Sequence, residues 1–423
     1  MTDPIPDLSP LRRHFPALQE TDEQGQTYVY FDGPGGTQVP QSVIDAMADY
    51  FVKANSNKGG PFITSRRNDK VLNQAHAAMA DFLNAPSPKE IVFGANMTTL
   101  TYNLSRSIGK MLKPGDEVIV TRLDHDANVS PWLALEEQDI TVKMVDFDVE
   151  DCRLDLEHLA SLLTDQTKLV AVGYASNAVG TINPIRRIAT MAHNVGAWLW
   201  VDAVHYAPHG PIDVQHLGCD FLVCSAYKFF GPHVGALWGK FDLLEKLPAY
   251  QVRPANPNVP YKFETGTLNQ EGIAGVTAAI DYLAEVGRQY GTPSTDQEAE
   301  TDRRQELKQA MHAIAAYERQ LFTHMIEQLQ TIPGITIYGI TEPDAFDERC
   351  PTVAFTHEGF TPAQIAAFLG ERGIFVWDGN YYAINATERL GVEDSGGMVR
   401  VGLAHYNTQE EVNRLITALK AMG

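Results

Sequence analysis

Cysteine is scarce in this sequence, and long hydrophobic runs are absent. Only 4 of the 423 residues are cysteine, and they are scattered without a CxxC spacing, which argues against a disulfide framework or a zinc site. No charge-free stretch is long enough to span a membrane, and the first residues lack the basic and apolar regions of a secretion signal. We therefore expect a cytoplasmic protein that binds no metal.

Positive charge is also in short supply. The chain has 33 lysines and arginines against 53 acidic residues, which gives a formal net charge of −20 at pH 7. This balance argues against nucleic acid or an anionic membrane surface as the main partner. Small anionic ligands can still be held locally by backbone amides and a few positive groups. A chain of 423 residues exceeds what one hydrophobic core usually serves, so we expect two domains.

Two apolar runs end in chemically active side chains. Phe221 to Ala226 and Ala197 to Val201 have the composition of buried parallel strands, and they lead to Lys228 and Asp202. The carboxyl ends of parallel strands share the edge of the sheet where ligands bind. A desolvated lysine there attacks carbonyl groups such as the aldehyde of pyridoxal 5'-phosphate, and an aspartate keeps a pyridine nitrogen protonated. Taken alone, Lys228 could also be an ordinary solvated lysine.

The rest of the chain alternates between strand and helix patterns. Strands near residues 90–94, 118–122 and 169–173 and a helix over 185–195 predict a mostly parallel sheet. A polar stretch begins near residue 291, and a long helix over 305–330 then leads to strands starting near residues 335 and 352. We predict an N-terminal segment, 1–30, that packs on the small domain, a large cofactor-binding domain, 31–290, and a small α+β domain, 291–423.

The segments around Asp202 and Lys228 resemble the class V aminotransferase group of fold-type I pyridoxal-phosphate enzymes. The cysteine desulfurase and selenocysteine lyase branch is the most similar, and the resemblance runs from about Tyr28 to the C-terminus. It implies the fold-type I α/β architecture, with a sheet of the seven-stranded type. It also implies that Asp202 pairs with the ring nitrogen of the cofactor and that Lys228 bonds to its aldehyde.

The same resemblance implies the other cofactor contacts. Thr98 and Thr99 open a helix at the place where the family binds the phosphate, and Ser225 adds a hydroxyl. His125 matches the histidine that stacks on the ring, and Asn177 matches the asparagine at the ring oxygen. His205 stands where desulfurases usually have glutamine, and both residue types can donate a hydrogen bond. From the residues alone, the threonine pair is equally well explained as a helix cap.

Two further segments resemble sequence motifs of the family, one that contacts the other subunit and one that binds the substrate. In the family's dimers, the threonine that matches Thr267 reaches the phosphate of the other subunit, which implies a homodimer with shared active sites. Arg400 matches the arginine of the C-terminal motif. An arginine fork binds a carboxylate with two hydrogen bonds, so we expect Arg400 to hold the α-carboxylate of an amino-acid substrate.

The loop over residues 373–383 departs from the desulfurase pattern. Tyr382 stands where that branch has its sulfur-accepting cysteine, and Trp377 replaces an arginine. We therefore expect Asn380 and Tyr382 to shape a substrate pocket, and Cys350 to lie away from this loop. The sequence predicts a carbon–sulfur β-lyase that acts on cysteine or a derivative without a protein persulfide. An epimerase or aminotransferase is the alternative, and a non-catalytic binding protein of the same fold is a further one.

Overall fold

The larger of two main sheets contains seven strands. The computed structural model describes residues 5–292 and 302–422, and the strand order is β2-β8-β7-β6-β5-β3-β4. Strands β3 to β7 run parallel, whereas β8 is antiparallel to both β7 and β2. The mostly parallel sheet predicted from the sequence is confirmed. Its strands are β2 (Ile91–Gly94), β3 (Glu117–Thr121), β4 (Thr141–Val145), β5 (Thr167–Gly173), β6 (Trp198–Asp202), β7 (Phe221–Ser225) and β8 (Gly235–Gly239).

Alternate residues of these strands belong to two different hydrophobic clusters. Ile119 packs on one face of the sheet, whereas its neighbours Val118 and Val120 pack on the other. Both faces are therefore covered, which explains why the strand sequences are apolar throughout rather than alternating. The helices that connect these strands or follow the last of them are α3 (Met97–Gly109), α4 (Ser130–Leu133), α5 (Leu156–Leu162), α6 (Ile185–Asn194), α7 (Val214–Leu217) and α8 (Phe241–Lys246).

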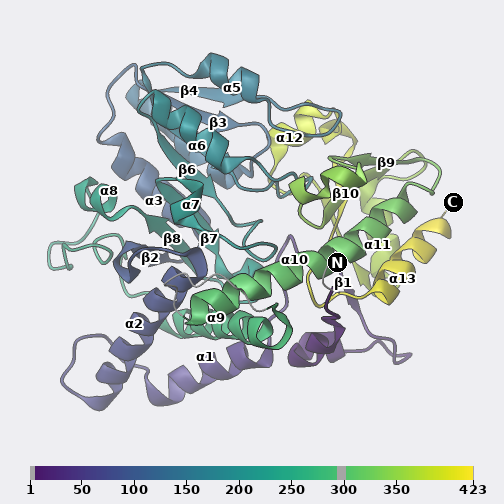
Figure 1. Ribbon diagram of the computed structural model, residues 1–423, viewed down its shortest axis with the longest axis horizontal. Coiled ribbons are helices and arrows are strands. Elements are labelled where there is room, and N and C mark those ends of the chain that lie inside the picture. The colour runs from purple at the N-terminus through teal and green to yellow at the C-terminus, as the bar shows by residue number, and fades with distance from the viewer. Residues whose placement is uncertain (1–4, 293–301, 423) are drawn as a thin grey trace.

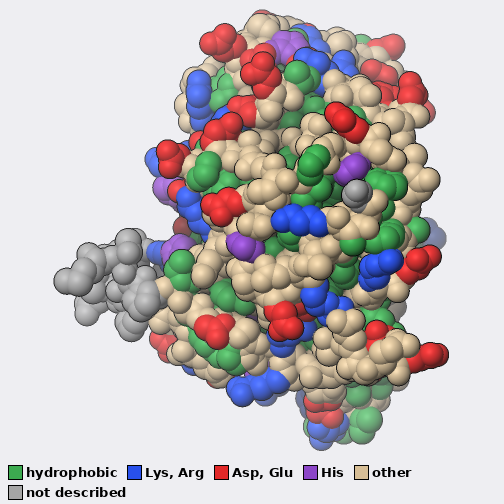
Figure 2. Space-filling model, turned by 90° about the vertical axis from the view of Figure 1, so that its right-hand side faces the viewer, with side chains coloured by type: hydrophobic (Ala, Val, Ile, Leu, Met, Phe, Trp, Pro, Cys, Tyr) green, Lys and Arg blue, Asp and Glu red, His purple; other side chains and the backbone are tan. Residues whose placement is uncertain are grey.

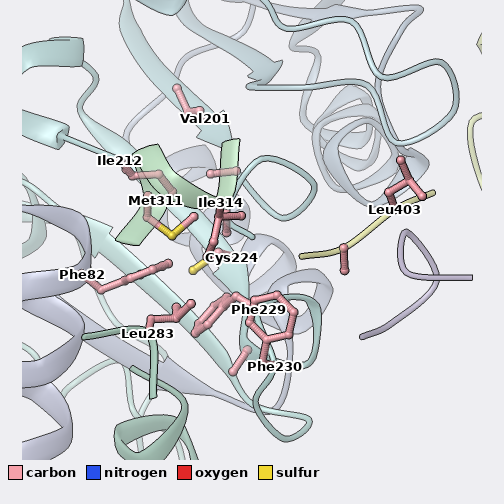
Figure 3. Packing of buried hydrophobic residues seen from close by; sticks show 14 of the residues in the cluster. Phe82, Val201, Ile212, Cys224, Phe229, Phe230, Leu283, Met311, Ile314 and Leu403 are labelled. Carbon is pink, nitrogen blue, oxygen red and sulfur yellow. The ribbon is translucent and has the colours of Figure 1, made fainter. Parts of the chain in front are cut away.

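Four further helices complete the core beside the large sheet: α1 (Gln41–Lys53), α2 (Ile63–Leu83), α9 (Gln270–Tyr290) and α10 (Asp302–Leu329). In Figure 1, α10 runs from beside α9 towards the smaller sheet. Gly287 allows α9 and α10 to approach closely, because a Cβ atom there would collide with the backbone of Glu306. Figure 3 shows Met311 and Ile314 of α10 near Cys224, which lies in β7, and near Phe229, which follows that strand.

The second sheet has four antiparallel strands in the order β12-β13-β10-β9. Its strands are β9 (Ile335–Tyr338), β10 (Thr352–His357), β12 (Trp377–Gly379) and β13 (Met398–Gly402), with helices α11 (Pro362–Gly370), α12 (Ile384–Arg389) and α13 (Gln409–Lys420). A short parallel pair joins β1 (Val29–Tyr30) to β11 (Ile374–Phe375). Arg12 donates to the Tyr406 carbonyl over 2.6 Å and forms an ion pair with Glu411.

The N-terminal segment thus contacts the C-terminal part of the chain, as Figure 1 also shows near α13. The division into domains at residues 31 and 291 stays a prediction. Most of the polar stretch after residue 291, including the acidic residues from 296, lies outside the described residues.

Charged side chains of both signs are interspersed on the face of the molecule shown in Figure 2. None of the helices in residues 5–292 and 302–422 is both long and apolar enough to cross a membrane.

Candidate active site

A cavity of about 620 Å³ lies at the carboxyl ends of the parallel strands. The residues that follow β3, β5, β6 and β7 meet there, as expected for an open α/β sheet. Most of the predicted cofactor contacts line this cavity, namely Thr98, Thr99, His125, Asn177, Asp202, His205, Ser225 and Lys228. The remaining predicted site residues, Thr267, Asn380, Tyr382 and Arg400, do not line it.

Lys228 ends the short 3-10 turn that follows β7, and its Nζ donates to the carbonyl oxygen of Pro34. The pKa of this amine is lowered to about 7, mainly by burial and additionally by the positive charge of Arg400, whereas the charges of Asp202 and Asp32 act in the opposite direction. A substantial fraction of the amine is therefore uncharged near neutral pH. An uncharged amine is the nucleophilic form and also the form that accepts a proton.

Asp202 is the last residue of β6, and its Oδ1 accepts a hydrogen bond of 2.9 Å from the Val204 amide. Burial raises the pKa of this carboxyl to about 6. A second buried carboxyl, Asp124, follows β3 and lines the same cavity. Its pKa is raised to about 7, mainly by burial and additionally by the charge of Asp202. Asp124 accepts hydrogen bonds from the Gly173 amide and from Asn128, so its position is fixed.

The start of helix α3 offers hydrogen-bond donors to an anion. Asn96 caps the helix through a reciprocal pair of hydrogen bonds with Thr99, so the cap is the asparagine and not the threonine pair. The Thr98 amide has no hydrogen-bond partner among the residues that the structure places, and it lies at the positive end of the helix dipole. The Ser225 hydroxyl accepts from the Met97 amide over 3.0 Å, which leaves its own O–H available to donate.

His125 lies in a loop after β3, where its Nδ1 accepts a hydrogen bond of 3.0 Å from the Ala127 amide. The pKa of His125 is lowered to about 4, mainly by burial and additionally by the charges of Lys228 and Arg400. The ring is therefore neutral at pH 7, with its proton on Nε2. The ring of Tyr382 stacks against it, with a centroid distance of 5.4 Å and an interplanar angle of 23°.

Asn177 and His205 also line the cavity. Asn177 donates from Nδ2 to the Tyr381 carbonyl over 2.8 Å, and its Oδ1 is buried without a partner among the described residues. The Nε2 of His205 lies 3.0 Å from Oγ1 of Thr352, the first residue of β10. The smaller sheet therefore supplies a contact to the edge of this cavity.

Arg400 approaches the cavity from the middle of β13. It donates from Nη1 to the Asn177 carbonyl over 2.8 Å, and its guanidinium lies 4.2 Å from the centre of the Tyr381 ring. Its buried Nε has no partner among the described residues. Burial lowers the pKa of Arg400 to about 10, which leaves the group charged at neutral pH. A buried, incompletely paired guanidinium is suited to bind a carboxylate.

The other predicted residues have different surroundings. Asn380 donates to Glu393 over 2.9 Å, and its Oδ1 accepts from the Tyr382 amide. Tyr382 is 73% exposed and Trp377 is 53% exposed. Thr267 is exposed in a loop before α9.

All four cysteines are buried and unpaired. Burial raises the pKa of Cys152 and Cys219 to about 12, and it also raises the pKa values of Cys224 and Cys350 above the usual value of a thiol. None of them is therefore a thiolate at neutral pH, which is the form that attacks sulfur.

Sequence reasoning did not select three polar residues that line the cavity, Asn96, Asp124 and His233. Asp124 directly precedes His125 at a strand end, so the rule that found Asp202 could also have found it. Asn96 is recognisable as a helix cap, but a helix cap does not by itself indicate that the residue binds a ligand. The rings of His233 and Tyr227 stack with their centroids 4.9 Å apart, and the sequence around them gave no indication of this contact.

The residues present fit pyridoxal phosphate. Free donors at the start of α3 suit its phosphate, Lys228 suits its aldehyde, and the buried Asp202 suits its ring nitrogen. The position of this cavity, at the strand ends of a seven-stranded sheet beside a smaller antiparallel one, defines a fold-type I enzyme of the pyridoxal-phosphate type.

The comparisons with known proteins give the family. The model of the aminotransferase class-V family matches residues 29–308 and 305–415. The chain belongs to this family, whose members, cysteine desulfurases among them, are pyridoxal-phosphate-dependent enzymes.

Individual relatives agree with this placement. The chain is 35% identical over 423 residues to an aminotransferase-like protein, FGM3, from Gibberella zeae, with 97% of both chains covered. It is 34% identical over 430 residues to a cysteine desulfurase from Synechococcus elongatus, which covers 98% of this chain but only 63% of that relative's length. Among solved structures, the cysteine desulfurase CsdA from Escherichia coli has a TM-score of 0.82 at 27% identity, covering 99% of this chain and 98% of the other.

Proposed function

We propose that this enzyme cleaves the carbon–sulfur bond of cysteine or a cysteine derivative by β-elimination, without forming a persulfide on the protein. The observation that carries the proposal is the absence of a usable thiol among the described residues. Every cysteine is buried with a raised pKa, and the position of the sulfur-accepting cysteine in the resembling branch is Tyr382. A phenol donates hydrogen bonds and protons but does not accept sulfane sulfur.

The roles of the residues follow from their positions. When bound, pyridoxal phosphate accepts the electron pair that remains on the substrate's Cα after a proton leaves. Lys228, with a pKa of about 7, accepts that proton. Asp202 stabilises a proton on the ring nitrogen. Arg400 binds the α-carboxylate through its free donors and so orients the bonds at Cα.

His125 and Tyr382 restrict the space around the reacting group. The proton of neutral His125 is on Nε2, because Nδ1 already accepts from the Ala127 amide. The face of this neutral ring can stack against the cofactor ring, and its Nε2–H can donate a hydrogen bond from the edge of the ring. The exposed Tyr382 and Trp377 provide apolar surface near the cavity, which suits a substrate with a larger side chain than that of cysteine.

The proposed reaction is balanced without an added oxidant or reductant. The Cα–H bond breaks, and its proton passes to Lys228. The Cβ–S bond then breaks, and the sulfur leaves with the bonding electrons as a thiolate or hydrosulfide, which takes up the proton held by Lys228. The remaining enamine reacts with water to give pyruvate and ammonia. A desulfurase would instead transfer sulfur to a cysteine thiolate and release alanine.

Epimerisation and transamination are the alternatives, since both begin with the same proton abstraction by Lys228. The similarity to the aminotransferase-like protein from Gibberella zeae favours keeping transamination as the second candidate. A non-catalytic binding protein would have no need of a near-neutral lysine beside Asp202 and Arg400. The absorbance spectrum of the purified protein tests that option, because a bound cofactor absorbs at wavelengths where protein does not.

We also propose that the enzyme is a cytoplasmic homodimer with shared active sites. Several large apolar side chains are exposed on α1 and at the start of α2, including Phe51, Val52 and Phe62. Exposed apolar groups concentrated on neighbouring elements are typical of an interface. Thr267 is exposed as well. A residue that contacts the phosphate of the other subunit has to be exposed in this way.

The test is an amino-acid screen that measures the products. The enzyme is incubated with cysteine, cystine and S-alkylated cysteines, and pyruvate, ammonia, sulfide or thiol, and alanine are quantified. We expect pyruvate, ammonia and the sulfur product to form in equal amounts. Lys228→Ala serves as the control and should abolish every product. Alanine in an amount equal to the sulfur released would contradict the proposal, and an oxo acid from a substrate without sulfur would support transamination.

A further inference from the structure

His205 connects the cavity to the smaller sheet. It lines the cavity, it is only 4% exposed, and its Nε2 lies 3.0 Å from Oγ1 of Thr352. Its other ring nitrogen, Nδ1, has no hydrogen-bond partner in the described part of the chain. Because Nε2 is already engaged, Nδ1 is the ring nitrogen that remains for a ligand in the cavity.

The surroundings of His205 keep its ring neutral. Burial lowers the pKa of His205 well below its usual value, and the charges of His209, Arg400 and Lys228 lower it further. The His209 ring lies 5.6 Å from the His205 ring, and its Nδ1 lies 2.9 Å from Oε2 of the buried Glu318. A neutral imidazole has a single N–H, so the position of that proton decides whether Nδ1 donates or accepts.

Thr352 is held firmly in place beside Nε2. It pairs with Gly402 of β13, and its carbonyl accepts hydrogen bonds from Nε and Nη2 of Arg349. Its side chain is fully buried and β-branched, which restricts its rotamers. The hydroxyl is therefore a fixed group whose O–H can be directed at the lone pair of Nε2.

We propose that Thr352 is a positioning residue: its hydroxyl donates to Nε2 of His205, which places the ring proton on Nδ1 and makes Nδ1 a donor to an anionic oxygen in the cavity. This inference rests on the assignment of the cavity to pyridoxal phosphate, for which the oxygen is that of the pyridine ring. With the proton on Nε2 instead, Nδ1 would direct a lone pair at a negatively charged oxygen.

The test compares the holoenzyme with four variants, which are Thr352→Val, Thr352→Ser, His205→Gln and the combination of Thr352→Val with His205→Gln. It measures cofactor affinity and the pH midpoint of the cofactor's absorbance change. Thr352→Val keeps the shape of the side chain but has no hydroxyl, whereas Thr352→Ser keeps the hydroxyl. A ring oxygen that loses a donor keeps more negative charge, which holds the proton on the Lys228 nitrogen to a higher pH. We expect Thr352→Val to raise the midpoint by about one pH unit and to weaken cofactor binding about tenfold. Thr352→Ser should change neither.

The decisive control places Thr352→Val in a His205→Gln background. A glutamine amide always has N–H donors, so its hydrogen bond does not depend on a tautomer. In that background Thr352→Val should have no further effect on either readout. An equal effect in both backgrounds would show a purely structural role for Thr352 and overturn the proposal. If Thr352→Val folds poorly, Thr352→Ala removes the same donor and has to give the same pattern.

The failure of this inference is distinguishable from the failure of the proposed function. A wild-type protein that binds no pyridoxal phosphate would overturn both. A wild-type protein that binds the cofactor normally, together with a Thr352→Val variant that has unchanged affinity and midpoint, would overturn only the role of Thr352.

Discussion

The pKa of Lys228 predicts how fast the protein without cofactor captures pyridoxal phosphate at different pH values. Only the uncharged amine attacks the aldehyde. With a pKa of about 7, half of Lys228 is uncharged at pH 7. An ordinary lysine, with a pKa of 10.5, is uncharged to only about three parts in ten thousand at that pH. Lys228 should therefore capture the cofactor about a thousandfold faster than a lysine model compound whose neutral amine is equally reactive.

The assay follows the cofactor's absorbance after rapid mixing at a series of pH values. The rate constant should rise through pH 7 and level off above about pH 8, whereas that of a blocked lysine continues to rise tenfold per pH unit. The blocked lysine, measured in parallel, also corrects for titration of the cofactor itself.

Two substitutions test the physical cause. The positive charge of Arg400 lowers the pKa of Lys228, and the negative charge of Asp202 raises it. Arg400→Gln should therefore move the midpoint to higher pH, and Asp202→Asn should move it to lower pH. A midpoint close to that of free lysine, or two shifts in the same direction, would refute this explanation.

Three further predictions concern binding, assembly and stability. Arg400→Lys should lower kcat/KM about tenfold to a hundredfold, mostly through KM, because a lysine cannot form the two parallel hydrogen bonds to a carboxylate; an unchanged KM would contradict this. Thr267→Ala should weaken cofactor binding about tenfold in a dimer that sedimentation shows to be intact, and undiminished binding would refute the proposed contribution across the interface. Met311→Ala should lower the free energy of unfolding by about 2 to 5 kcal/mol, since Met311 is buried between α10 and the large sheet. Denaturant titration measures this, and the cofactor spectrum should stay the same.

The sequence predicted those parts of the fold that depend on local patterns. The runs before Asp202 and Lys228 are apolar because both faces of the sheet are covered, and this is visible without a structure. Helix boundaries were accurate to within a few residues: α10 begins at Asp302 instead of residue 305, and α6 ends at Asn194 instead of residue 195.

Contacts between distant segments were beyond sequence reasoning. His205 and Thr352 are 147 positions apart, and nothing in either segment indicates that they meet. The stacking of Tyr382 on His125 likewise depends on loop geometry that composition does not determine. The positions of Lys228 and Asp202, by contrast, follow from a general rule about strand ends.

The mass of the intact protein during turnover tests the central claim most directly. The enzyme is mixed with excess cysteine, quenched during steady product release, and analysed before and after treatment with a reductant. The proposed elimination predicts an unmodified polypeptide mass, with pyruvate accumulating in solution. A reductant-sensitive gain of one sulfur atom on Cys350 or another cysteine, together with alanine, would contradict the claim and establish sulfur transfer through the protein.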